Sequence, residues 1–422
     1  MSTDSLSNRG FRNYHYQEKE KGLLPIKQNS PQTCPQSSFA EQFSTSAFTR
    51  NRSENLRSWL YKKYPSASEK KFTSQSNSPF SFEKNSKKNC GRVRWIPPKL
   101  SIDNNFLNSL SIVAQTEDYD SHNGCQLMYY GFSKNSEQDA FFSSDGEWII
   151  VPWEGKLEII TEFGSLKIEA HEIAVIPRFC RFWINTLSTS AKGYIAENAG
   201  SPMNLPDLGP IGANGLANPD HFLSAVLNNN KIKENKYTIY SKSSRQFFKS
   251  EDNFNPFCTL AWKGNSYPYK YDLRQFNTIN TVSYDHPDPS IFTVLSSCSS
   301  TPGAANLDFV VFPPRWMVAE NTFRPPYYHR NIMNELMGLI SGQYDAKTGD
   351  GFQPGGLSIH NCGYGHGPDL ESLKKAQSSE LKPFYIKDTM AFMFESKYPW
   401  QINISWLNHE SRDHNYEKCW SF

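Results

Sequence analysis

The sequence has 422 residues, a length that predicts two domains, or one large β domain with an elaborated partner, rather than one ordinary hydrophobic core. Its 44 Lys and Arg residues nearly balance its 42 Asp and Glu residues, which argues against a nucleic-acid-binding protein that relies on a basic field. The aromatic content of 14%, with 26 prolines and 24 glycines, is typical of short strands joined by tight turns, so we expect an all-β fold.

The N-terminus and the cysteines together predict a cytoplasmic protein. The first residues are polar and lack the charged-then-apolar order of a signal peptide. Nowhere does an apolar run approach the length needed to cross a membrane, so we expect no membrane partner. The eight cysteines lie singly, without a CxxC pair, which favours reduced structural thiols.

The first 100 or so residues are rich in Ser, Asn, Gln, Lys and Pro, with isolated aromatic clusters at 57–61 and 94–97. We interpret this part as an irregular arm that wraps a core. Disorder is the alternative for the first 20 residues, where the apolar content is lowest.

From Trp148 the sequence changes to short apolar or alternating runs separated by Gly, Pro and Asp, a pattern that predicts the strands of a sandwich or barrel. Residues 205–219 are dense in Pro and Gly and predict an ordered loop. The predicted strands are 148–152, 156–161, 166–169, 173–177, 182–184 and 193–195.

A second β-rich block begins near Thr278, so we divide the chain into residues 1–277, an arm and a β-sandwich domain, and residues 278–422. Residues 331–337 in this block could instead form a helical turn. The strands predicted there are 291–295, 309–312, 390–394 and 402–406.

Four of the ten histidines lie in this second block: His286, His329, His360 and His366. Two imidazoles and one carboxylate, such as Glu335, could bind one face of iron(II) and leave its other positions for substrate and oxygen. A His and a Glu six residues apart have no privileged spacing on a helix or a strand, so the spacing alone is more typical of surface or core residues than of metal ligands.

Several motifs of the chain match one known family. The main one is Phe323-Arg-Pro-Pro-Tyr-Tyr-His-Arg-Asn331 with Glu335 after it, and others lie at 205–219, 285–295, 312–316, 366–369 and 390–396. With these motifs the chain resembles the homogentisate 1,2-dioxygenases, and the resemblance covers most of residues 40–420.

The resemblance implies an iron(II) enzyme that opens the ring of homogentisate with O2 to give maleylacetoacetate, in tyrosine and phenylalanine catabolism. The family's iron ligands fall on His329, Glu335 and His366, and its acid/base histidine falls on His286. Its substrate-binding residues fall on Tyr344 and again on His366. The resemblance also implies a β-sandwich N-terminal domain, a cupin-like jelly roll for residues 278–422, and trimers that pair into a homo-hexamer.

The sequence departs from the family most at 116–131. It also lacks the HxH step of the better-known cupin metal pattern, which leaves His360 as a competing ligand; we prefer His366 because it stands in His-Gly-Pro-Asp. Two other functions stay open at this point: an iron enzyme for another hydroquinone or an aminophenol, and a metal-free β-sandwich that binds aromatics or sugars without reacting.

Overall fold

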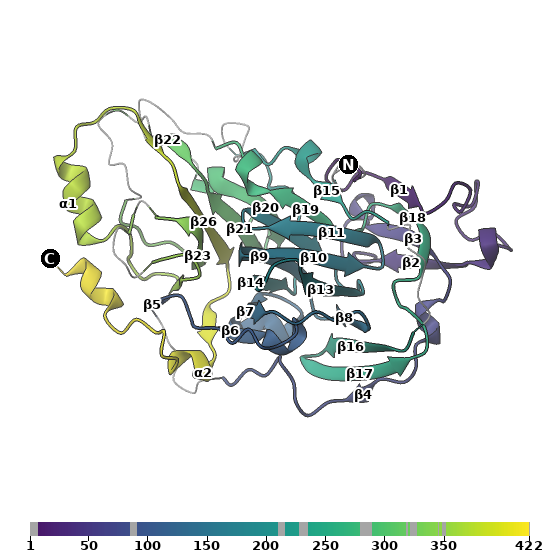
Figure 1. Cartoon of the computed structure of the whole chain (residues 1–422). Coiled ribbons are helices and arrows are strands. Elements are labelled where there is room, and N and C mark those ends of the chain that lie inside the picture. Colours follow the sequence, from purple (N-terminus) through teal and green to yellow (C-terminus); the bar gives the residue numbers. More distant parts are fainter. Residues whose placement is uncertain are drawn as a thin grey trace.

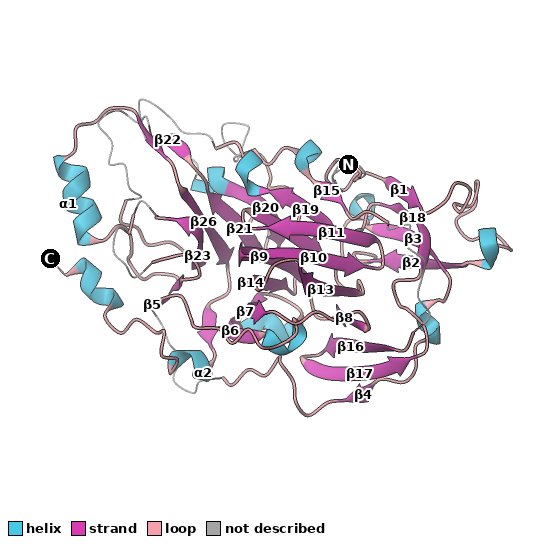
Figure 2. Cartoon of the chain, viewed as in Figure 1, coloured by secondary structure: helices cyan, strands magenta, loops and turns pink. Residues whose placement is uncertain are grey.

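The computed structural model describes residues 7–84, 91–209, 216–227, 235–278, 289–317, 320, 327–344, 346–347 and 352–421. These residues form mostly strands, and the helices among them are α1 (Leu370–Ser378), α2 (Ile404–Leu407) and short 3-10 turns (Figure 2). The expectation of an all-β fold is confirmed. No helix in the described part of the chain is both long enough and apolar enough to cross a membrane.

Two large sheets share the main hydrophobic core (Figure 1). Aromatic side chains join them: the ring of Phe141 in one sheet lies 5.0 Å from that of Trp148 in the other. The eight-stranded sheet has the order β15-β19-β12-β9-β14-β7-β6-β27, with β6 (Ser111–Thr116), β7 (Cys125–Phe132), β9 (Glu147–Glu154), β12 (Glu172–Ile176), β14 (Ala191–Asn198), β15 (Leu223–Ser224), β19 (Tyr269–Asp272) and β27 (Trp400–Ile402). The seven-stranded sheet has the order β11-β10-β13-β8-β16-β17-β4, with β4 (Thr73–Ser74), β8 (Asp139–Ser143), β10 (Lys156–Thr161), β11 (Gly164–Glu169), β13 (Phe182–Thr186), β16 (Tyr237–Ser243) and β17 (Gln246–Asp252).

Strand β10 shows why alternating residues form a strand here. Leu157 and Ile159 are fully buried, whereas Lys156 is exposed, so one face of the strand packs into the core and the other meets solvent. The strand turns into β11 at Gly164, whose φ of +119° favours glycine.

The first 100 residues contribute strands, and the expectation of a wholly irregular arm was wrong for these segments. A four-stranded sheet of order β1-β18-β3-β2 combines β1 (His15–Glu18), β2 (Phe39–Ser44) and β3 (Arg57–Lys62) with β18 (Thr259–Gly264). Leu60 and Tyr61 of β3 are fully buried, so the aromatic cluster at 57–61 is a core strand. Because β1 lies within the first 20 residues, ordered structure extends into the part for which disorder was the alternative.

The C-terminal block forms a six-stranded sheet of order β20-β21-β26-β23-β24-β5, with β5 (Arg92–Trp95), β20 (Thr293–Cys298), β21 (Ala305–Phe312), β23 (Asn334–Gly342), β24 (Leu357–His360) and β26 (Thr389–Ser396). Strand β22 (Arg315–Met317) pairs with β25 (Phe384–Ile386) in a small separate sheet. Residues 334–337 lie in β23, so the helical turn considered for 331–337 does not form.

The predicted strand 402–406 was wrong beyond its first residue. Strand β27 ends at Ile402, and helix α2 follows at once. Asn403 begins this helix because its side chain accepts a hydrogen bond from the backbone N–H of Ser405. The apolar residues Trp406 and Leu407 are therefore buried from a helix rather than from a strand.

Two strands cross the predicted division near residue 278. Strand β5, from the N-terminal part, pairs with β24 at the edge of the six-stranded sheet. Strand β27, from the C-terminal part, pairs with β6 at the edge of the eight-stranded sheet. The division into residues 1–277 and 278–422 stays a prediction, and each part completes a sheet of the other.

Candidate metal centre

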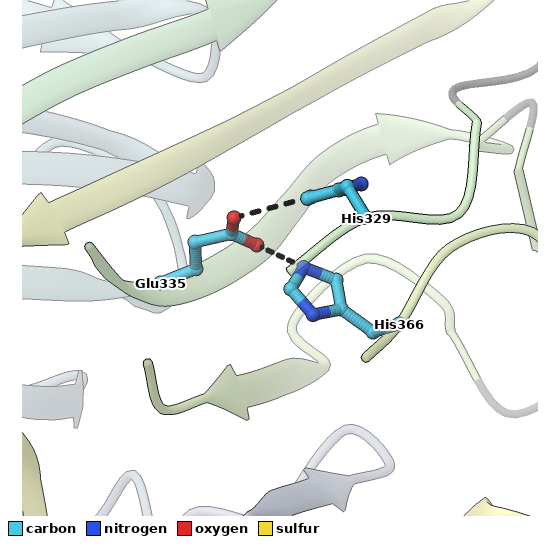
Figure 3. A group of neighbouring side chains, drawn as sticks. All are labelled: His329, Glu335 and His366. Carbon is cyan, nitrogen blue, oxygen red and sulfur yellow. Dashed lines mark hydrogen bonds and ion pairs between the residues drawn. The ribbon is translucent and has the colours of Figure 1, made fainter. Parts of the chain in front are cut away.

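Three side chains from separate segments meet at the N-terminal end of β23 (Figure 3). Glu335 is the second residue of that strand, while His329 and His366 lie in two loops. The two loops are joined by a pair of backbone hydrogen bonds: the His329 N–H donates to the His366 carbonyl over 2.9 Å, and the His366 N–H donates to the His329 carbonyl over 3.1 Å. This bridge brings together two histidines that are far apart in the sequence.

The ligand atoms of the three residues all lie within 4.8 Å of one another. His366 Nε2 is 2.7 Å from Glu335 Oε2, and His329 Nε2 is 3.4 Å from Glu335 Oε1. The side chains of Glu335 and His366 are each 7% exposed, whereas that of His329 is 29% exposed. The group is therefore buried on the Glu335 side and reaches solvent at His329.

His329 and His366 both direct Nε2 toward Glu335, because in each ring a backbone carbonyl holds the other nitrogen, Nδ1. His329 Nδ1 lies 2.9 Å from the carbonyl oxygen of Tyr327, and His366 Nδ1 lies 2.9 Å from that of Tyr364. Because a carbonyl can only accept, each Nδ1 carries a hydrogen and each Nε2 is left to face Glu335, as a donor when the ring is protonated and as a metal ligand when it is neutral. Histidine ligands of metals are commonly oriented in this way, so two imidazole nitrogens and one carboxylate fit a divalent transition metal such as iron(II).

The charge of Glu335 also suits a cation. Burial favours its neutral form, but hydrogen bonds from His329, His360 and His366 hold the pKa of the carboxyl well below its ordinary value. The hydrogen bond to Glu335 raises the pKa of His329, against the effect of burial. Glu335 is therefore a carboxylate at neutral pH.

His360 lies beside the three candidate ligands, with one ring nitrogen toward Glu335 and the other toward Tyr416. In the pairing of β23 with β24 it stands opposite Glu335, and its Nδ1 lies 3.5 Å from Glu335 Oε2. Its ring stacks on that of His366 at 4.2 Å, and its Nε2 lies 2.6 Å from the hydroxyl of Tyr416. Among the described residues, the candidate metal group contains His366 and leaves His360 beside it.

The chain matches two family models that adjoin each other, the homogentisate 1,2-dioxygenase N-terminal model over residues 7–273 and the C-terminal model over residues 274–422. The chain belongs to the homogentisate 1,2-dioxygenase family. A homogentisate 1,2-dioxygenase of Legionella pneumophila (strain Corby) is 49% identical over 417 residues, with 97% of each chain covered. One of Pseudomonas savastanoi pv. phaseolicola is 48% identical, over 98% of this chain and 94% of the relative.

A solved cupin 2 conserved barrel domain protein from Leptotrichia buccalis is a distant match, with 10% identity and a TM-score of 0.24 over 64% of this chain and 83% of that one. The sequence resemblance to the homogentisate 1,2-dioxygenase family is confirmed by the family models and the two relatives.

The structure does not test the roles that the family resemblance gives to His286 and Tyr344. His286 lies outside the described residues. Tyr344 is 6% exposed and packs in a small apolar cluster, with its ring 5.8 Å from that of Phe312 and 6.1 Å from that of Phe352. Their acid/base and substrate-binding roles stay predictions.

Asn331 is a functional candidate that sequence reasoning missed. Its side-chain amide donates to Glu335 Oε1 over 2.6 Å, which fixes the oxygen that faces His329. Asn331 ends the motif that carries the family resemblance, so the sequence did mark its position. The sequence does not indicate that its side chain orients a carboxylate.

Replacing Asn331 with alanine is expected to weaken metal binding about 10- to 100-fold, the usual effect of removing a partner that orients a ligand. Glu335 would lose the donor that holds Oε1. Competition with a chromogenic chelator under anaerobic conditions measures the change. Asn408→Ala, at the end of α2, is the control, and equal affinities of N331A and the parent protein would contradict the assigned role.

A row of carboxyl groups crosses the sheet from the metal centre. Glu395 of β26 is paired with Glu335 on one side and with Asp308 of β21 on the other. Burial, and then the charges of Glu335 and Asp308, raise the pKa of Glu395 to about 8. Burial raises the pKa of Asp308 to about 6.

The metal-free protein is therefore expected to lose stability as the pH rises from about 4.5 to about 8, because folded Glu395 holds a proton that the unfolded chain releases. Glu395→Gln removes this dependence and should be more stable than the parent at pH 7, by about 2–3 kcal/mol. Thermal midpoints at pH 5 and pH 8 measure the effect. Parallel pH profiles for the parent and E395Q would contradict it.

Proposed function

We propose that the chain is a homogentisate 1,2-dioxygenase, which opens the aromatic ring of homogentisate with O2 to give maleylacetoacetate in tyrosine and phenylalanine catabolism. The observation that carries the proposal is the convergence of His329 Nε2, His366 Nε2 and a Glu335 oxygen in a chain that belongs to this family along nearly its whole length. Two histidines and one carboxylate are the ligand set typical of non-haem iron(II) oxygenases, which favours an enzyme over a binding protein.

The residues that would hold iron(II) are His329, Glu335 and His366. When bound there, iron(II) would supply Lewis acidity and redox chemistry with oxygen. Glu335 contributes the single negative charge of the ligand set, and the backbone carbonyls behind the two histidines keep their Nε2 lone pairs available. The His329 side chain is partly exposed, so in this proposal substrate approaches the centre from that side.

The remaining roles concern the substrate itself. In this proposal His286 takes up a phenolic proton of homogentisate, and Tyr344 donates a hydrogen bond to the substrate. His366 borders the substrate as well as holding the metal. The burial of Glu335 and His366 keeps water from the inner side of the centre, where a reactive intermediate must be protected.

The proposed assembly and location follow the family resemblance. We propose a homo-hexamer formed from two trimers, acting in the cytoplasm on homogentisate and O2 without a nucleic-acid or membrane partner. Sedimentation or light scattering of the purified protein would measure the assembly, and a trimer or monomer at micromolar concentration would contradict it.

The function is tested by loading the purified protein with Fe(II) anaerobically, adding homogentisate and air, and following oxygen uptake together with the ultraviolet absorbance of maleylacetoacetate. Gentisate, which lacks the methylene of the acetate arm, is the comparison substrate. Equal amounts of oxygen and homogentisate should be consumed, with much slower turnover of gentisate. Folded, iron-loaded protein that turns over gentisate or an aminophenol in place of homogentisate would overturn the substrate, and protein that binds aromatics without consuming oxygen would overturn the enzyme.

A further inference from the structure

A buried chain of three side chains leads away from Glu335 into the protein. Lys347 Nζ donates to the Tyr416 hydroxyl over 2.9 Å, and that hydroxyl lies 2.6 Å from His360 Nε2. The other nitrogen of His360, Nδ1, lies 3.5 Å from Glu335 Oε2. Lys347, Tyr416 and His360 are 4%, 2% and 3% exposed, so water does not compete for these contacts.

The chemistry of these three side chains determines which atom donates in each of their hydrogen bonds. Lys347 donates to Tyr416, so the tyrosine hydroxyl accepts from the lysine and its own hydrogen is free to go to His360 Nε2. An Nε2 that accepts leaves the ring hydrogen on Nδ1, the nitrogen that faces Glu335. Burial, and then the charge of Arg94, lowers the pKa of Lys347 to about 7; the neutral amine still has two hydrogens, which serve Tyr416 and, over 3.4 Å, Ser358.

Tyr416 is held in place from several elements. The guanidinium of Arg94 lies 4.3 Å above its ring, and the ring of Trp420 lies 5.0 Å away. Arg94 is fixed in turn by two hydrogen bonds to Asp413. Because Arg94 is on β5 and β5 pairs with β24, the strand that carries His360, the same framework positions both ends of the Tyr416–His360 hydrogen bond.

Stability alone does not explain a lysine at this position. Burying an amino group is unfavourable unless the protein compensates for the lost water, and Lys347 donates its hydrogen bonds to two neutral hydroxyl groups. A methionine would fill the same space beside the Phe352 and Tyr416 rings, which lie 5.0 Å and 5.2 Å from the amino nitrogen. Polar groups kept in this way often serve a functional site.

We propose that Lys347 and Tyr416 are positioning residues of the metal centre, which hold His360 in the form that presents its Nδ1–H to Glu335. Without the tyrosine hydroxyl, the ring hydrogen can move to Nε2 and leave the Nδ1 lone pair facing a carboxylate oxygen, which disfavours the geometry in which Glu335 binds a metal. The expected effect on turnover rests on the proposed function. The expected effect on Fe(II) affinity does not, because it concerns the binding of the metal alone.

The test uses Tyr416→Phe and Lys347→Met in the full-length protein. We expect both variants to bind Fe(II) about 10- to 100-fold more weakly in anaerobic competition with a chromogenic chelator. In metal-free protein with 15N-labelled histidine, the resonances of His360 should shift from the Nδ1–H form toward the Nε2–H form in both variants, because without Lys347 the Tyr416 oxygen is open to accept from Nε2–H. With homogentisate, kcat should fall while KM changes little, because substrate contacts are left intact.

Tyr267→Phe is the matched control. Its hydroxyl is also buried and donates to backbone carbonyls, those of Gly10 and Asn13, far from the centre. This variant should lose a comparable amount of thermal stability yet keep the Fe(II) affinity and the histidine resonances of the parent protein. An equal loss of Fe(II) affinity in Y267F would overturn the proposal, because the effect would then reflect stability in general.

The proposal is also wrong if Y416F and K347M bind Fe(II) as tightly as the parent and leave the His360 resonances unchanged. If Y416F does not fold, K347M decides by the same two measurements, because it keeps the tyrosine ring and its packing. If neither the parent protein nor the variants consume homogentisate, the proposed function fails. The present inference still stands in that case if the two variants bind Fe(II) more weakly and their His360 shifts from the Nδ1–H form toward the Nε2–H form.

Discussion

Replacing Glu335 with glutamine is expected to abolish metal retention and reduce turnover by more than about 100-fold, beyond the effect typical of residues that only orient a ligand. The change keeps the shape of the side chain but removes the one carboxylate of the set. His329 and His366 would then face a neutral amide, which is a poor ligand for a divalent metal. Metal content after gel filtration and oxygen uptake with homogentisate measure the two losses.

Glu380→Gln is a suitable control because the Glu380 side chain is 79% exposed and its carboxylate pairs with the exposed Lys382. It should retain the metal and the turnover of the parent protein. A Glu335→Gln protein that still co-purifies with stoichiometric iron would show that the ligand set is wrong, and would direct attention to His360 as the replacement donor.

The largest expected effect on stability is at Lys242, in the N-terminal part of the chain. Its side chain is fully buried, its ammonium forms an ion pair with the equally buried Glu197, and it donates to Gln126 and Tyr119. Burial opposes ionisation of Glu197, but Lys242 holds its pKa below the ordinary value. Lys242→Met would leave a buried carboxylate without its counter-charge, at an expected cost of about 3–5 kcal/mol.

Thermal or urea unfolding of K242M measures this loss. The double variant Lys242→Met with Glu197→Gln should recover most of it, because the amide oxygen can still accept from Ser143 and Trp148 and no buried charge is left. If the double variant is as unstable as K242M, the loss is due to packing rather than to the unpaired charge.

The sequence predicted strands best where one face is buried and the other is not. In the predicted strand 156–161, residues 156–159 alternate between polar and apolar side chains, and strand β10 has the predicted bounds. It failed at 402–406, where the alternating order Ile-Asn-Ile-Ser-Trp is typical of a strand although Asn403 begins a helix. A helix cap depends on one local hydrogen bond, and so short an alternating segment is compatible with either structure.

The candidate site could not be derived from spacing. His329 and His366 become neighbours through two backbone hydrogen bonds between loops, which no periodic pattern encodes. The resemblance to the homogentisate 1,2-dioxygenases pointed to both residues and to Glu335. It did not point to Lys347 or Tyr416, because residues that act through His360 are recognised only when the hydrogen bonds between distant segments are known.

The exchange of edge strands between the two parts of the chain bears on how the protein can be produced and degraded. A gene divided near codon 278 would encode an N-terminal piece whose β6 has lost β27, and a C-terminal piece whose β24 has lost β5. Each piece would display a bare strand edge, the kind of surface that recruits other chains into aggregates. Expression of the catalytic half alone is therefore expected to yield inclusion bodies, and co-expression of both halves should restore some soluble protein.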